Sequence, residues 1–321
     1  MTKATRAAYG ETLVELYNEG VDVVAVDADL SGSTTTKKLG EAAPERLINV
    51  GIAEQNMIDV AAGLSLTGHI AFTGSFAVFG TGRVYDQIRN TVCYSNLNVK
   101  VAPTHAGLSV GPDGGSHQML EDIALMRVLP NMRVLVPADY PSAKRALRIA
   151  AATDGPVYVR MGRAAVPMIY GSGSLGAAAK APDTSDLALG KACVLREGSD
   201  VSIVACGLEV EQVLRAAEKL ADSGISAEVI DAFSIKPLDA GTILESVRKT
   251  GRVLTAEEHS IIGGLGSAVA ECLVENDVRL KSPMKRVGVR DRFGTSGQLD
   301  ELLVEYGVDA ASICDVVLSF K

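Results

Sequence analysis

The chain has 321 residues, of which 47% are hydrophobic and 22% are charged, and its formal net charge is −8 at pH 7. This length predicts about two domains, with hydrophobic cores large enough to need no disulfide or structural metal. The negative charge argues against nucleic-acid binding, and no apolar run is long enough to span a membrane.

The N-terminal half alternates apolar runs with helical patterns. Residues 1–16 form an amphipathic helical pattern that is unlike a signal peptide. The clearest strands are at residues 21–27, 99–102, 133–136 and 157–161. This alternation predicts an α/β domain over residues 1–168, with a doubly wound parallel sheet that carries helices on both faces.

Glu54 follows an apolar run in this half. Residues 47–50 predict a short buried strand that ends at Gly51, and residues 58–66 predict a small-residue helix that is too apolar to face water. Glu54 is therefore expected between a buried strand and a buried helix. Such a carboxyl group either satisfies a backbone donor or exchanges a proton with a bound molecule, and the pattern alone leaves both open.

A glycine-rich polar loop, residues 104–118, follows the strand at residues 99–102. It contains two of the four histidines, His105 and His117, with Asp113 between them. Open α/β sheets bind ligands at loops of this kind, at the carboxyl ends of parallel strands. The spacing matches no standard zinc site, and no serine lies in a nucleophile elbow. A simple turn is the alternative explanation for Asp113, which precedes two glycines.

The C-terminal half repeats the α/β pattern after a segment without periodicity, and the linker is expected at residues 169–190. A second doubly wound domain is expected at residues 191–321. The run Gly263–Gly266 is no dinucleotide fingerprint, and close backbone packing is favoured over anion binding. Five cysteines, far apart and odd in number, indicate neither a disulfide framework nor a zinc site, and they suit a reducing cytoplasm: Cys93, Cys193, Cys206, Cys272 and Cys314.

Residues 51–57 resemble the pyrimidine-binding domain of thiamine-diphosphate enzymes, and of transketolase in particular. In that family the glutamate at the position of Glu54 bonds the aminopyrimidine ring of the cofactor, and aromatic residues at the positions of Phe76 and Phe79 flank the ring. Core packing is the alternative role for both phenylalanines. Gly82 stands where the family often has a tyrosine, so one wall of the pocket would differ. The second half resembles the transketolase C-terminal domain.

The polar loop also resembles a transketolase segment, T-H followed by G-x-D-G-x-x-H-Q. The resemblance implies that Asp113 orients sugar hydroxyl groups and that His117 assists proton transfer near the cofactor. It places His105 towards the phosphate end of the sugar. These three residues, with Glu54, would then line one active site.

Two more segments resemble the phosphate end of the transketolase site. They place Arg6 and Ser33 there, and a second arginine is assigned to Arg163, with Arg160 as the competing choice. Arginine matches phosphate oxygens through two parallel hydrogen bonds. With His105, these side chains would form an anion clamp for a sugar phosphate.

The sequence lacks one feature that the family requires. Thiamine-diphosphate enzymes bind the diphosphate through Mg²⁺ or Ca²⁺ at a Gly-Asp-Gly motif, which occurs nowhere in this chain. The resemblance therefore implies a split transketolase, with this chain as the C-terminal subunit. A separate N-terminal subunit would carry the Gly-Asp-Gly motif in an α2β2 assembly. The expected reaction is ketol transfer from a ketose phosphate to an aldose, in the cytoplasm.

Three alternatives stay open. The β subunit of a 2-oxo acid dehydrogenase decarboxylase component has the same domain order, and residues 85–90 would suit it, but the anion clamp and the polar loop argue against it. Deoxyxylulose phosphate synthase is a single long chain, and it lacks a histidine at the position of His105. A non-catalytic assembly subunit is the third. The joint presence of Glu54, Asp113 and His117 argues against that reading.

Overall fold

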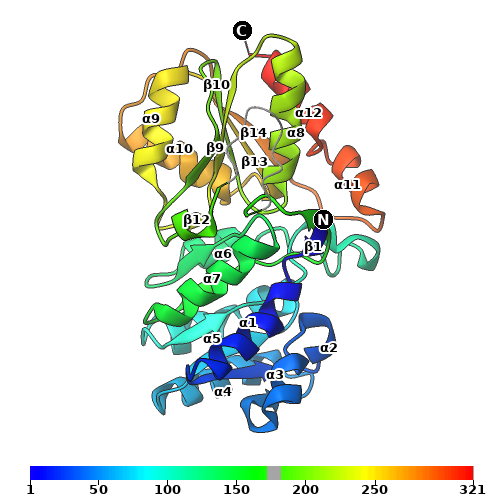
Figure 1. The fold of residues 1–321 in the computed structure, drawn as a ribbon, viewed down its shortest axis with the longest axis vertical. Helices are drawn as coiled ribbons and strands as arrows, with labels where there is room; N and C mark the ends of the chain where they lie inside the picture. Colours follow the sequence, from blue (N-terminus) through cyan, green and yellow to red (C-terminus); the bar gives the residue numbers. More distant parts are fainter. Residues whose placement is uncertain (172–181, 321) are drawn as a thin grey trace.

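The computed structural model describes residues 1–171 and 182–320, which form two α/β parts stacked along the long axis (Figure 1). Ten residues of the expected linker, 172–181, lie outside the described residues. Each part has a central sheet with helices on both faces, so the predicted fold class is confirmed. No helix in the described ranges is long and apolar enough to cross a lipid bilayer.

The N-terminal part is built on a seven-stranded sheet in the order β12-β6-β7-β5-β4-β2-β3. Six strands come from the first half of the chain and run parallel: β2 (Val23–Asp27), β3 (Leu47–Asn49), β4 (Ile70–Gly74), β5 (Val99–Val101), β6 (Arg133–Leu135) and β7 (Val157–Val159). The seventh, β12 (Ser234–Lys236), comes from the second half and pairs antiparallel with β6. The two halves therefore share a sheet edge that the sequence did not predict.

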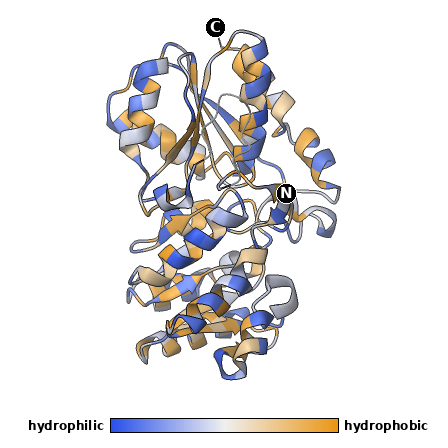
Figure 2. Ribbon diagram, viewed as in Figure 1, coloured by the Kyte–Doolittle hydropathy of each residue, from blue (hydrophilic) through white to orange (hydrophobic). Residues whose placement is uncertain are grey.

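Both faces of this sheet are covered, which explains why all of β2 is buried. Val23 and Ala25 belong to the same hydrophobic cluster as α1 (Ala7–Asn18) and α7 (Tyr140–Ala152). Val24 and Val26 face the other way, into the cluster that contains Met57 and Ile58 of α4 (Glu54–Leu66). The hydropathy colouring shows hydrophobic strands, and helices with a hydrophobic and a hydrophilic side (Figure 2).

Three local expectations were wrong. The first residues form a strand, β1 (Thr2–Ala4), which pairs antiparallel with β8 (Ala165–Pro167), so the first helix starts only at Ala7. The strand β3 is a half-exposed edge strand. The helix α4 begins at Glu54 itself, and its outer face is exposed, including Leu66. Met57, Ile58 and Ala61 are buried on the inner face of α4, whereas its exposed residues are Gln55, Asn56, Asp59, Gly63 and Leu66.

The C-terminal part has a five-stranded sheet in the order β14-β13-β10-β11-β9, parallel except for β9. Its strands are β9 (Cys193–Arg196), β10 (Val201–Ala205), β11 (Ala227–Asp231), β13 (Val253–Ser260) and β14 (Lys285–Val289). Its helices are α8 (Glu209–Asp222), α9 (Ala240–Thr250), α10 (Leu265–Glu275), α11 (Leu299–Glu305) and α12 (Ala310–Leu318). At the start of α10, Glu257 accepts hydrogen bonds from the backbone amides of Leu265 (2.7 Å) and Gly266 (2.8 Å), so its own carboxylate occupies the site considered for an anion.

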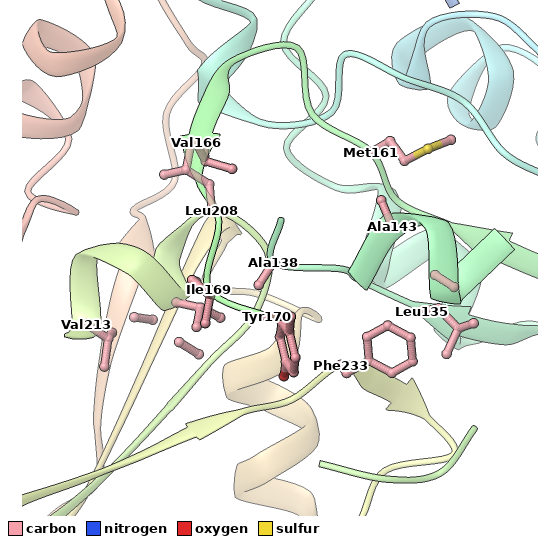
Figure 3. Packing of buried hydrophobic residues seen from close by; sticks show 14 of the residues in the cluster. Leu135, Ala138, Ala143, Met161, Val166, Ile169, Tyr170, Leu208, Val213 and Phe233 are labelled. Atoms are coloured by element: carbon pink, nitrogen blue, oxygen red, sulfur yellow. The ribbon is translucent and has the colours of Figure 1, made fainter. Parts of the chain in front are cut away.

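One hydrophobic cluster crosses the junction between the two parts. Val166, Ile169 and Tyr170 from the end of the first part lie with Leu208 and Phe233 of the second (Figure 3). All five side chains are buried. Burial of this kind stabilises by about 25 cal/mol per Å² of apolar surface, so this cluster helps to hold the two parts together.

Candidate active site

The loop between β3 and α4 delivers Glu54 to the first turn of the helix. Gly51 makes this turn with φ of +73°, a backbone conformation that suits glycine. Glu54 is only 5% exposed. A carboxylate in the first turn of a helix interacts favourably with the partial positive charge there. The side chain is thus buried and held at a helix N-terminus.

Arg83 is the partner of Glu54, and the sequence did not single it out. Its Nη1 donates to Glu54 Oε1 over 2.8 Å, and its guanidinium lies 4.4 Å from the ring centroid of Phe79. Arg83 is half-exposed, so it reaches Glu54 from the solvent side. The sequence signal that could have indicated this partner was a positively charged residue four positions after Phe79.

Four aromatic rings gather next to this pair. Phe76 and Phe79 lie nearly parallel, with centroids 6.2 Å apart and planes inclined by 17°. The His117 ring meets Phe79 edge-on at 5.4 Å, and the His105 ring stacks on Phe76 at 3.8 Å. Phe76 follows β4 directly, and both histidines belong to the polar loop, so the carboxyl ends of β4 and β5 bring these rings together.

The expected anion-binding residues also lie together. Arg6 Nη1 donates to the backbone carbonyl of Ser33 over 3.0 Å and lies 3.3 Å from His105 Nε2. Arg163 donates to the carbonyl of Val110 in the polar loop over 3.1 Å. Burial lowers the pKa of Arg6, and the positive charge of Arg163 lowers it further. The group of Ser33 that Arg6 contacts is the backbone carbonyl and not the side-chain hydroxyl.

Asp27 shapes the turn that carries Ser33, and the sequence did not single it out either. Its carboxylate accepts from the Leu30 amide (2.6 Å) and from the hydroxyls of Thr34 (3.0 Å) and Thr36 (2.8 Å). Burial raises the pKa of Asp27 despite these donors. A buried carboxylate at the end of β2 thus fixes the turn whose Ser33 carbonyl accepts from Arg6.

Arg160, the alternative to Arg163, does not face this cluster. Its guanidinium is buried between Asp122 (Nε to Oδ2, 2.7 Å) and Glu258 (Nη1 to Oε1, 3.3 Å). Burial raises the pKa of Asp122, but the Arg160 charge outweighs it and holds that pKa below its usual value. Arg160 therefore serves the junction between the two parts, and of the two arginines only Arg163 lies with Arg6 and His105.

Asp113 is the most exposed of the expected residues. It ends the turn Leu108–Asp113, and its negative charge partly opposes the lowering of the Arg6 pKa by burial and by Arg163. His117 is partly exposed, and its Nδ1 lies 3.0 Å from the hydroxyl of Ser116. Both side chains can therefore contact a bound molecule without first leaving a buried partner.

His105 is neutral. Because Arg6 can only donate, Nε2 of His105 accepts, and Nδ1 carries the hydrogen towards Thr104 Oγ1 at 2.7 Å. Burial, together with the charges of Arg6 and Arg163, lowers the pKa of His105 to about 3. Neutral His105 thus carries no positive charge at neutral pH, and its ring holds the Arg6 guanidinium in place through Nε2.

This buried neutral histidine predicts an acid-labile fold. Below pH 6.5 the unfolded chain binds a proton at His105 that the folded chain refuses until about pH 3, so stability falls as the pH falls through this window. The loss is about 1.4 kcal/mol per pH unit for one proton. Urea unfolding over this range should therefore give a steeper loss for wild type than for His105→Gln. Parallel curves would contradict the burial of a neutral imidazole.

The residues around Glu54 fit an aminopyrimidine ring. A flat, weakly basic heterocycle needs an apolar surface on its face and a carboxyl group at its edge, and Phe76, Phe79 and Glu54 offer both. In the described ranges no group of three or more His, Cys, Asp or Glu side chains gathers as metal ligands. Glu54, Phe76 and Phe79 are therefore suited to the aminopyrimidine ring of thiamine diphosphate.

Comparison with known proteins gives the same family for both parts. The family "Transketolase, pyrimidine binding domain" matches residues 1–168, and "Transketolase, C-terminal domain" matches residues 190–313. The chain is 47% identical to a protein of Methanocaldococcus jannaschii described as a transketolase C-terminal section, over 98% of this chain and 96% of that protein. It is 43% identical to a 6-deoxy-6-sulfo-D-fructose transketolase subunit of Clostridium sp., over 96% and 91% of the two chains.

A solved structure is similar along its whole length. It is described as a split gene transketolase, inactive beta4 tetramer, with a TM-score of 0.84 and 48% identity, covering 99% of this chain and 97% of that one. Membership of this family implies dependence on thiamine diphosphate, with the pyrimidine-binding domain in this chain. The chain belongs to the transketolase family, as a C-terminal subunit of the split, two-chain type.

Proposed function

We propose that this chain is the C-terminal subunit of a two-chain enzyme that transfers a two-carbon ketol unit from a ketose phosphate to an aldose. One observation carries the proposal. An unbroken line of contacts runs from Glu54 through Arg83 and Phe79 to His117, and from Phe76 through His105 to Arg6. A cofactor ring and a sugar phosphate would lie at its two ends.

Each residue has a defined task in this proposal. Thiamine diphosphate, when bound, supplies the carbanion chemistry. Glu54 shares a proton with the nitrogen at the edge of the ring, in a site shielded from water. Phe76 and Phe79 bind the face of the ring. His117 moves a proton at the donor oxygen, and Asp113 accepts hydrogen bonds from the sugar hydroxyls.

At the phosphate end of the site, positive charge and fixed side-chain positions bind the phosphate group of the substrate. Arg6 and Arg163 bind the phosphate oxygens, and neutral His105 positions the Arg6 guanidinium by accepting at Nε2. Binding energy from this remote group orients the reacting carbonyl. The backbone of Ser33 holds Arg6 in place, and the Val110 carbonyl holds Arg163.

The proposal requires a second chain. An N-terminal subunit with a Gly-Asp-Gly motif would bind Mg²⁺ or Ca²⁺ and the diphosphate, in an α2β2 assembly. The similar split-gene protein is described as an inactive tetramer of β chains, which supports inactivity of the C-terminal subunit alone. The exposed outer face of α4, which includes Leu66, offers apolar surface for such an assembly.

The direct test is a coupled assay of ketol transfer from xylulose 5-phosphate to ribose 5-phosphate, with thiamine diphosphate and Mg²⁺. It is run on this chain alone, on the Gly-Asp-Gly partner alone and on the mixture. Transfer in the mixture only would support the proposal. A mixture that assembles and binds the cofactor but transfers no ketol unit from any ketose donor would contradict it.

A sulfonated sugar is a second candidate donor. A relative with 43% identity is described as a 6-deoxy-6-sulfo-D-fructose transketolase subunit. A sulfonate, like a phosphate, is a tetrahedral anion whose oxygens accept from arginine, so Arg6 and Arg163 would bind either group. The same assay with 6-deoxy-6-sulfo-D-fructose as donor compares the two through their kcat/KM values.

Arg163→Ala is expected to raise KM for phosphorylated donors more than it lowers kcat. The lost contact is made equally in the bound substrate and in the transition state, so its removal weakens uniform binding. One charge-assisted hydrogen bond contributes about 1.5–3 kcal/mol, which corresponds to an increase of roughly 10- to 100-fold. The exposed Arg279→Ala is the matched control, and an unchanged KM in Arg163→Ala would remove Arg163 from the clamp.

A further inference from the structure

The C-terminal part of the chain holds the polar loop at both of its ends. Near the start of the loop, the Ser109 amide donates to Glu258 Oε2 of β13 over 3.0 Å. At its end, the side-chain amide of Gln118 donates to the carbonyl of Thr295 over 2.9 Å, a residue 177 positions further along the chain. Asp113 lies between these two anchors, and His117 directly precedes the second.

The Gln118 side-chain amide contacts three backbone carbonyls, two in the turn Leu108–Asp113 and one in the segment 294–297. Besides Thr295, its Nε2 lies 3.2 Å from the carbonyl of Leu108 and 3.4 Å from that of Gly111. All three partners are carbonyl oxygens, so only the NH₂ side of the amide can face them. Gln118 is 4% exposed. One buried amide thus ties both ends of the turn Leu108–Asp113 to the C-terminal part.

Glycines on both sides permit the close approach. A Cβ atom on Gly294 would lie 1.7 Å from Gln118 Oε1, and one on Gly115 would lie 2.3 Å from the carbonyl oxygen of Gly294. A Cβ on Gly114 would lie 2.5 Å from Ser296 Oγ, and φ of Gly114 is +79°. The segment 294–297 leads into α11. It fits this closely against the polar loop because Gly114, Gly115 and Gly294 carry no side chain. Figure 1 shows α11 beside this junction.

We propose that Gln118 and the segment 294–297 are positioning elements of the active site, which set the place of Asp113 and His117 for the sugar. The C-terminal domain would then take part in substrate binding through the loop that it holds. This inference rests on the proposed function for the roles of Asp113 and His117. The anchoring itself rests only on the contacts above.

The physical reason is the exposure of the two side chains. Asp113 and His117 are exposed or partly exposed, so neighbouring side chains restrain them little and the loop backbone decides where they lie. A displacement of about 1 Å in a positioning element costs roughly 100-fold in rate. The donated contacts of the buried Gln118 amide and the three close glycine approaches restrain this backbone.

The test uses Gly294→Ala, Gln118→Met and a control. Gly294→Ala forces the loop and the segment apart, and Gln118→Met keeps the side-chain length but removes the three donated hydrogen bonds. Gly241→Ala in α9 is the matched control, because a Cβ there meets its nearest atom, Asp239 Oδ1, at an ordinary 3.5 Å. Hydrogen–deuterium exchange of residues 107–119 is measured on the chain alone, together with its melting temperature.

The kinetic measurement is made on the mixture with the partner subunit. For both loop variants we expect faster exchange in residues 107–119 and a kcat/KM for the ketose lowered by about 100-fold. The affinity for thiamine diphosphate should stay as in wild type, because Glu54, Phe76 and Phe79 belong to other segments. A general loss of folding would instead speed exchange throughout the chain and lower the melting temperature, the cofactor affinity and kcat/KM together.

Two results separate this inference from the proposed function. Exchange in residues 107–119 that stays at the wild-type rate in both loop variants would overturn the anchoring, whatever the activity. Faster exchange with an unchanged kcat/KM would overturn the positioning role. A wild-type mixture without ketol transfer would contradict the proposed function, while the exchange rates would still decide whether the C-terminal part holds the loop.

Discussion

Glu54→Gln is expected to lower ketol transfer by roughly 10²- to 10⁴-fold, the range of a general acid–base contribution, and to leave the fold intact. The amide has the same size and can still accept the hydrogen bond from Arg83, which spans 2.8 Å in the wild-type protein. It cannot share a proton with a ring nitrogen. The loss should therefore appear in kcat rather than in stability.

The measurement is the coupled assay on the mixture with the partner subunit, with assembly followed by size-exclusion chromatography. The exposed Glu45→Gln serves as control for the same chemical change at the surface. If Glu54→Gln turned over at close to the wild-type rate, Glu54 would not be the residue that activates the cofactor. If it failed to assemble, Glu54→Asp would separate a loss of structure from a loss of chemistry.

Arg160→Met is expected to lower the free energy of unfolding by about 3–5 kcal/mol, the usual cost of breaking a buried ion pair from one side. Methionine fills a similar volume but leaves the carboxylates of Asp122 and Glu258 buried without their shared cation. Because Glu258 belongs to the C-terminal part, the junction should weaken before either sheet does. Urea unfolding of the isolated chain measures the loss.

Arg148→Met is the matched comparison. Arg148 also pairs with two carboxylates, Glu15 and Glu19, but at the surface, where such pairs contribute at most about 1 kcal/mol. Equal losses in the two variants would show that burial does not decide the role of Arg160. A stable Arg160→Met protein with a raised KM for sugar phosphates would return Arg160 to the anion clamp.

Much of the molecule follows from local sequence pattern. Alternating apolar runs and helical periodicity predicted two α/β parts, and their central strands lie within a few residues of the expected ranges, as β5 does at Val99–Val101. The segments that contain Glu54 and the polar loop resembled one family, and comparison with known proteins confirmed that family. Short-range periodicity and short motifs suffice here because strand burial and turn geometry depend mainly on neighbouring residues.

Local errors had local causes. The apolar composition of α4 suggested complete burial, but only one side of the helix is buried, and Leu66 on the other side is 73% exposed. The first residues read as helix, yet pairing with Ala165–Pro167 makes them a strand. The pairing partner is far away in the sequence, so a helical pattern over residues 1–16 could not reveal it.

The sequence by itself determined the fold class, the family and the group of residues that meet at the ends of β4 and β5. Only the tertiary structure decided between Arg160 and Arg163, paired Arg83 with Glu54 and brought β12 to the sheet of the other half. It alone joined Gln118 to Thr295 across 177 residues. The reason is physical: a charged or amide side chain takes its role from the partner it meets in space, and the partners here lie on separate elements that only the packing of the two parts brings together.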